Sequence, residues 1–60
     1  MTKIDWEINI ENYAARVAEK YGMEMVKSVF KRYGATGFYN LNPCYYDEVF
    51  GDLMLMGEDS

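Results

Sequence analysis

The sequence predicts an all-α fold, a small domain of three helices. Apolar residues recur at intervals of three and four along most of the chain. A base followed by Tyr-Gly occurs at residues 20–22 and again at 32–34, and Asn42-Pro43 has the form of a helix start. A base in the last turn complements the helix dipole, and a glycine just beyond it readily adopts positive φ. We therefore expect one domain over 1–60, with helices at 10–21, 23–33 and 43–56.

The N-terminal segment 1–9 is expected to be an extended arm or a lone strand. Ile4, Trp6, Ile8 and Ile10 alternate with polar residues, which is the period of a β-strand. A lone strand would pair with its copy across a two-fold axis or with the edge of a partner's sheet. The same residues also fit a helical stripe, so a helix that begins early is the alternative.

The first predicted helix, 10–21, has Asn9 in position to cap its N-terminus. Ile8 would then pack on Tyr13 as a hydrophobic staple. Its expected apolar stripe consists of Ile10, Tyr13, Ala14, Val17, Ala18 and Tyr21.

The second predicted helix, 23–33, follows Gly22 directly, which makes the connection a tight corner. Its lysines face outward, and a single turn capped by Thr36 is expected near 36–41. The residues expected to face the core are Met23, Val26, Val29, Phe30 and Tyr33.

The third predicted helix, 43–56, starts at the Asn42 cap with Pro43 as its first helical residue. Gly51 falls in its middle, where glycine costs about 1 kcal/mol relative to alanine. We therefore expect the backbone at Gly51 to pack closely on a neighbour. The apolar stripe consists of Tyr46, Val49, Phe50, Leu53 and Met56.

Composition narrows the function. The chain has 60 residues, no histidine and one cysteine, so imidazole chemistry and Cys/His zinc sites are absent from it. We expect no enzyme, no cofactor and no metal site. Cys44 is interpreted as a small filler near a helix N-terminus, not as a reactive thiol. No apolar run reaches the ~20 residues of a membrane span, and no signal-peptide pattern occurs, so a cytoplasmic location is expected.

A domain of this size is marginal by itself, which favours a partner or a second copy. The surface scaling law predicts about 4,000 Å² for the folded chain. Charge is uneven along the sequence: the net is −2 over residues 1–15, +3 over 16–32 and −5 over 33–60. A partner would therefore meet an anionic, aromatic surface in the C-terminal third.

The candidate protein-binding residues combine tyrosines, which are common interface anchors, with carboxylates that attract a basic partner. The simpler alternative is that the aromatics close the core and the acids cap the third helix. A different class, a nucleic-acid accessory factor, would use a basic patch, although the acidic third helix disfavours direct nucleic-acid binding. The protein-binding set is Tyr39, Tyr45, Tyr46, Asp47, Glu48 and Asp52, and the basic set is Arg16, Lys20, Lys27, Lys31 and Arg32.

The stretch from Ala18 to Asp59 contains the helix ends Glu-Lys-Tyr-Gly and Lys-Arg-Tyr-Gly-Ala, the turn Asn-Leu-Asn-Pro and the helix Tyr-Tyr-Asp-Glu-Val-Phe-Gly-Asp-Leu. Through these motifs it resembles short uncharacterised proteins of bacterial mobile elements and prophages. This resemblance implies a setting in which small acidic inhibitors of host nucleases, of the anti-CRISPR or anti-restriction type, are frequent. It carries over no functional residue. The expected function is a small acidic protein-binding module, with inhibition of a nucleic-acid-processing enzyme as the role that the resemblance implies. A homo-oligomerisation module is the third alternative.

Overall fold

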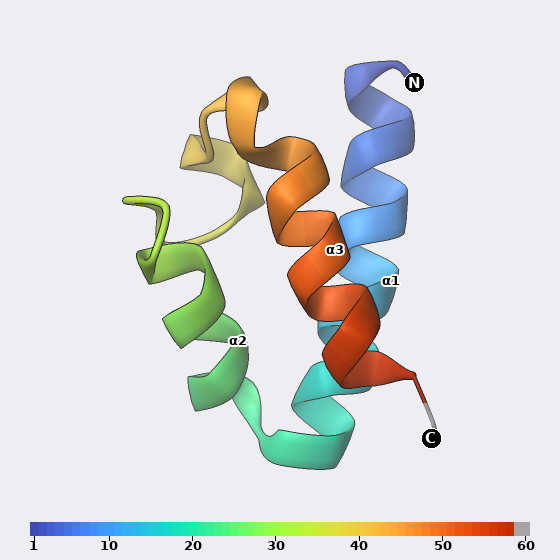
Figure 1. Cartoon of the computed structure of the whole chain (residues 1–60), viewed down its shortest axis with the longest axis vertical. Coiled ribbons are helices and arrows are strands. Elements are labelled where there is room, and N and C mark those ends of the chain that lie inside the picture. Colours follow the sequence, from blue (N-terminus) through green and yellow to red (C-terminus); the bar gives the residue numbers. More distant parts are fainter. Residues whose placement is uncertain (59–60) are drawn as a thin grey trace.

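The computed structural model describes residues 1–58 and confirms the all-α prediction (Figure 1). α1 (Lys3–Tyr21) and α3 (Tyr46–Gly57) lie side by side and run in the same direction. α2 (Met23–Lys31), which comes between them in the sequence, runs in the opposite direction. Two 3-10 turns, η1 (Phe38–Asn40) and η2 (Pro43–Tyr45), join α2 to α3. Within residues 1–58 no helix is both long and apolar enough to cross a membrane.

The accessible surface is 4082 Å², close to the ~4,000 Å² expected for a chain of this mass. The Cα radius of gyration, 10.4 Å, is likewise that of an ordinary compact domain. The three helices therefore bury as much surface as a monomeric protein of this size normally does.

The expected extended arm at 1–9 is wrong, because α1 begins at Lys3. Thr2 caps it: the Thr2 hydroxyl accepts a hydrogen bond from the Asp5 amide at 3.2 Å, and the Asp5 carboxylate accepts one from the Thr2 amide at 3.3 Å. This reciprocal capping box stabilises the first turn. Asn9, the expected cap, lies inside α1 and donates from its side-chain amide to the Asp5 carbonyl at 2.8 Å.

The alternating isoleucines are divided between two sides of the helix instead of two faces of a strand. Ile10 is fully buried and Trp6 is half-buried, whereas Ile4 and Ile8 are exposed. Ile8 therefore does not act as the expected staple. The stripe predicted for α1 is otherwise in place, except that Tyr21 at its end is exposed.

The core lies where the three helices meet. Aromatic rings join α1 to α3, with ring centroids 5.9 Å apart for Trp6 and Phe50 and 5.5 Å apart for Tyr13 and Phe50. From α2, Met23 is exposed in spite of its predicted inward position. The buried apolar residues are Ile10, Val17, Val26, Val29, Phe30, Ala35, Phe38, Leu41, Tyr46, Val49 and Leu53.

The helix connections follow the predicted glycines. Gly22 and Gly34 both have positive φ, at +91° and +76°, which side chains rarely adopt. α2 ends at Lys31, two residues before its predicted end, and a turn leads to Gly34. The expected single turn near 36–41 is present as η1. Thr36 is not its cap as expected; instead, the Asn40 side chain accepts a hydrogen bond from the Thr36 amide.

The predicted start of the third helix is present as a 3-10 turn that precedes α3. The Asn42 side chain accepts the Cys44 amide at 3.1 Å, with Pro43 next to it. The expected close packing at Gly51 is wrong, because a Cβ there would meet no atom within 4 Å. The close approach occurs at Gly57 instead, where a Cβ would lie 3.3 Å from Cδ1 of Tyr13.

Candidate protein-binding surface

The structure divides the predicted protein-binding residues between core and surface. Tyr46 belongs to the core: it is 6% exposed, and its ring stacks on Phe38 at a centroid distance of 4.8 Å. The Trp6 ring also lies near it, with the centroids 6.1 Å apart. The prediction of Tyr46 as a contact residue is therefore wrong, because the phase of α3 turns it inward beside Val49 and Leu53.

Tyr39 and Asp47 are exposed but lie apart from the main group. Tyr39 is 83% exposed on η1, where its hydroxyl shares a 2.8 Å hydrogen bond with the Thr36 hydroxyl. Asp47 precedes Asp52 by five residues, which places the two carboxylates about 140° apart around α3. Neither residue extends the surface that contains Asp52.

Three of the predicted residues, Tyr45, Glu48 and Asp52, come together with the two residues that follow the end of α2. The Tyr33 hydroxyl donates to Oδ2 of Asp52 at 2.6 Å, and the Tyr33 and Tyr45 rings lie 5.2 Å apart. Arg32 Nη1 lies 3.7 Å from the same carboxylate oxygen. We call these five residues, Arg32, Tyr33, Tyr45, Glu48 and Asp52, the tyrosine–carboxylate cluster.

The surroundings of Tyr33 in the cluster raise the pKa of its phenol. The hydrogen bond to Asp52 raises the pKa of Tyr33 from 10.0 to about 12; burial and the negative charges of Asp52 and Glu48 act in the same direction, and Arg32 opposes them. The phenol is protonated at neutral pH, as an ordinary tyrosine is, and the raised pKa extends its role as a hydrogen-bond donor into the alkaline range. The phenol holds the Asp52 side chain, which is 30% exposed, in one orientation at the surface.

Sequence reasoning placed Tyr33 in the core stripe of the second helix and Arg32 in the basic patch. Neither assignment includes the contact with Asp52, which lies 19 positions after Tyr33 in the sequence. The available signal was the position of residues 32 and 33 just before Gly34, at a helix end, where side chains are free to reach a neighbouring element.

The five basic residues of the alternative patch are distributed over three places. Arg16 lies over the Tyr13 ring at 5.0 Å, and Lys20 Nζ donates to the Glu58 carbonyl at 3.1 Å, both beside the end of α3. Lys27 and Lys31 lie along α2, and Arg32 belongs to the tyrosine–carboxylate cluster. These five residues therefore do not form one continuous basic surface.

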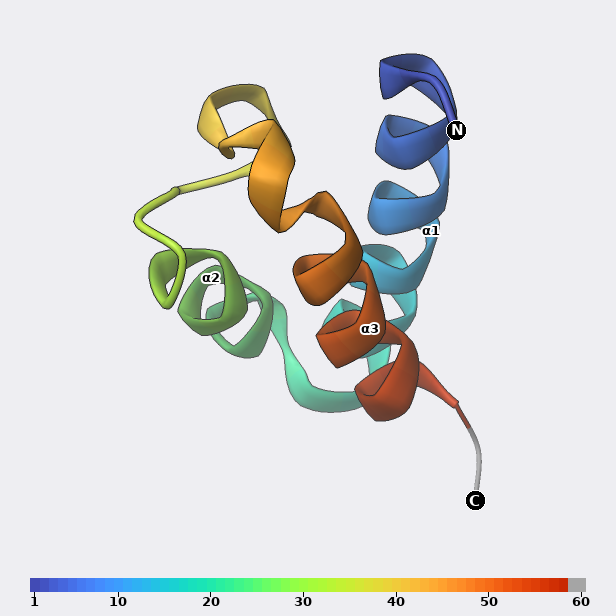
Figure 2. The same cartoon turned by 45° about the horizontal axis from the view of Figure 1, so that its top comes forward.

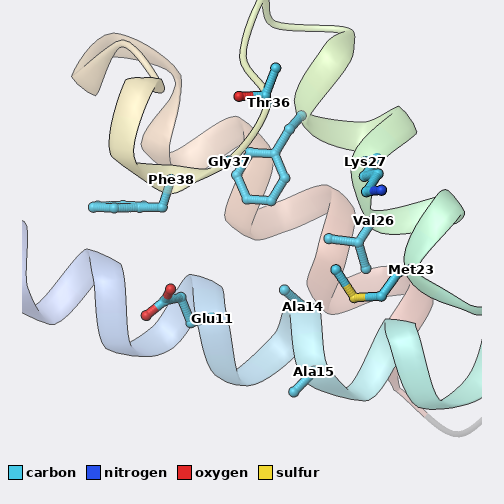
Figure 3. Close-up of a pocket in the computed structure, with 10 residues that line it drawn as sticks. Glu11, Ala14, Ala15, Met23, Val26, Lys27, Thr36, Gly37 and Phe38 are labelled. Carbon is cyan, nitrogen blue, oxygen red and sulfur yellow. The ribbon is translucent and has the colours of Figure 1, made fainter.

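Other chemistry is sparse in the described part of the chain. Residues 1–58 contain no group of three or more potential metal ligands, and Cys44 is an exposed free thiol. An apolar groove of about 340 Å³ lies between α1 and α2 (Figure 3). Comparison with known proteins finds no family, curated protein or solved structure that matches the chain.

Proposed function

We propose that the protein is a binding module that recognises a basic protein through the tyrosine–carboxylate cluster. The observation that supports it is the 2.6 Å hydrogen bond from Tyr33 to Asp52, which fixes an aromatic pair beside two carboxylates at the surface. Tyr45, 37% exposed, offers the accessible ring of that pair.

Order in the free protein favours affinity, since side chains that are already held lose less entropy on binding. Tyrosine supplies a large contact area with only two side-chain torsions. Arg32 partly neutralises Asp52, whereas within residues 1–58 no base lies at ion-pair distance from Glu48. Glu48 is therefore the carboxylate best placed to meet a lysine or arginine of a partner.

Long-range charge points the same way. α3 carries Asp47, Glu48 and Asp52 and no base of its own. Arg32 lies against Asp52, and Arg16 and Lys20 lie beside the C-terminal end of α3, so the negative field is strongest around Asp47 and Glu48 at its start. Such a field speeds the approach of a basic surface and weakens as salt is added. A nucleic-acid-binding groove is a common basic surface of this kind, so we include in the proposal a nucleic-acid-processing enzyme as the partner that the module inhibits.

The test is affinity capture from a host extract followed by titration of the captured protein against purified variants. Tyr45→Ala and Glu48→Lys are expected to lose binding at least tenfold, with binding of the wild type falling as salt rises. Tyr39→Ala is the matched control, since Tyr39 is a more exposed tyrosine outside the cluster. Equal binding by all four proteins contradicts the proposal.

A gel-shift experiment at low salt addresses the competing class. Tight DNA binding that disappears when Arg16, Lys20, Lys27, Lys31 and Arg32 are changed to Gln, and that survives in Glu48→Lys, would also overturn the proposal.

A further inference from the structure

A second surface, formed mainly by α1 and α2, carries exposed apolar residues. Ile4 and Ile8 of α1 are 66% and 53% exposed, and Ala15 is exposed as well. Intervals of four and seven residues place all three on one side of the helix. α1 thus has an exposed apolar ridge in addition to the stripe that it buries, and Ala15 of this ridge also lines the groove beside α2.

This ridge continues into the groove of about 340 Å³ between α1 and α2. The small side chains of Ala14 and Ala15 line the α1 side of the groove, and Figure 3 shows Met23 and Val26 on the α2 side. Glu11 of α1 and Lys27 of α2 also lie on opposing sides. Among the described residues, none from α3 lines the groove. The lining residues are Glu11, Ala14, Ala15, Met23, Val26, Lys27, Phe30, Thr36, Gly37 and Phe38.

The two parts of this face have complementary charge. Glu7 and Glu11 border the α1 ridge on one side and Glu19 borders it on the other, as their spacing along the helix requires. The α2 wall carries Lys27 and Lys31 instead. Lys27 is 3.9 Å from Glu24, an exposed and weak pair, and Lys31 has no ion-pair partner within residues 1–58.

We propose that the groove receives the outer face of α1 from a second copy of this chain. The apolar ridge of that helix would enter the groove, and its acidic borders would lie near the lysines of α2. A two-fold axis makes the contact reciprocal, so each copy gives its α1 and receives its partner's. Lys27 and Lys31 disfavour a basic helix against the α2 side of the groove, whereas Glu11 lies on the opposite wall.

A dimer interface of ordinary size would cover a large part of this small molecule. Stable interfaces bury about 800 Å² per partner, which is about one-fifth of the 4082 Å² of accessible surface. The Cα atoms span 27 × 21 × 14 Å, so the dimer would use most of one broad face. None of the residues of the tyrosine–carboxylate cluster lines the groove.

Sedimentation equilibrium over a range of protein concentrations tests the proposal. The wild type is expected to pass from 7.0 kDa toward twice that mass as concentration rises. Ile8→Glu, which places a charge in the ridge, is expected to raise the dimer dissociation constant tenfold or more, and Lys31→Glu to raise it as well. Leu55→Glu is the matched control, because Leu55 is 73% exposed on α3, outside the face.

Circular dichroism establishes that each variant retains the helical fold. A wild type that remains at 7.0 kDa up to about 1 mM overturns the proposal. So does a dimer that Leu55→Glu dissociates and Ile8→Glu does not. If Ile8→Glu fails to fold, Ile4→Gln and Lys31→Glu, both at exposed positions, carry the same comparison.

Discussion

Replacing Tyr33 by phenylalanine removes the hydroxyl that binds Asp52 and leaves the ring that packs on Tyr45 in place. A hydrogen bond to a charged group contributes about 1.5–3 kcal/mol when shielded from water. Here the Asp52 side chain is 30% exposed and that of Arg32 is 54% exposed, so solvent screening reduces the contribution to about 1 kcal/mol. We expect Tyr33→Phe to lower the melting temperature by about 4–8 °C, as that free energy implies for a domain of this size.

The dependence on pH has a definite sign. Because the pKa of Tyr33 is about 12 in the folded protein and 10.0 ordinarily, the fold favours the protonated phenol. The stabilisation is complete below pH 10.0 and is lost as pH rises to about 12. Wild type and Tyr33→Phe should therefore converge in stability across this interval, since the phenylalanine ring of the variant has no proton to lose.

Urea unfolding of both proteins from neutral to alkaline pH measures the difference, and absorbance titration should show the Tyr33 phenol ionising near pH 12. Asp52→Asn and the double variant complete a cycle that isolates the pair from other effects of each substitution. Equal stability of wild type and Tyr33→Phe at neutral pH, or a difference that persists unchanged above pH 12, refutes the reasoning.

Three further substitutions test the fold by urea or thermal unfolding. Gly51→Ala should stabilise the protein by about 0.5–1 kcal/mol, because a Cβ meets nothing within 4 Å in mid-helix; destabilisation would show a hidden contact. Gly57→Leu should destabilise it by about 1–3 kcal/mol, since a Cβ already lies 3.3 Å from Tyr13 and 3.6 Å from Val17, and a neutral effect would contradict this packing. Thr2→Ala should cost about 1 kcal/mol by removing the cap of α1, whereas an extended N-terminus would be indifferent to it.

Local signals predicted the helix boundaries well where a single residue determines the backbone. Gly22 and Gly34 have positive φ, and Asn42-Pro43 opens the last helical segment, because these effects need only neighbouring atoms. The N-terminus was harder, since alternating isoleucines suit a strand as well as a helix with apolar residues on two sides. The Thr2–Asp5 spacing was the local signal for the helix.

The candidate surface depended on tertiary contacts that no local pattern contains. Tyr45 and Tyr46 are adjacent and chemically identical, yet only Tyr46 is turned toward Phe38 and buried. Likewise, Tyr33 reaches Asp52 only because α2 ends beside α3. Composition could identify tyrosines and carboxylates as the relevant residues, but selecting among them required the relative placement of two helices.

The apolar ridge is left exposed because of its position around α1. The N-terminal turns of α1 contact Tyr46 and Phe50 of α3 through Trp6, whereas Ile4 and Ile8 project from another side of the helix and stay 66% and 53% exposed. Figure 2 shows α1 at the edge of the molecule, where a second chain could cover these side chains. A dimer formed through this ridge would present two tyrosine–carboxylate clusters at once, and linked sites bind a multivalent surface more tightly than single ones. Ile8→Glu should then weaken binding to a dense basic surface while leaving the affinity of one cluster for one partner unchanged, which separates the two proposals.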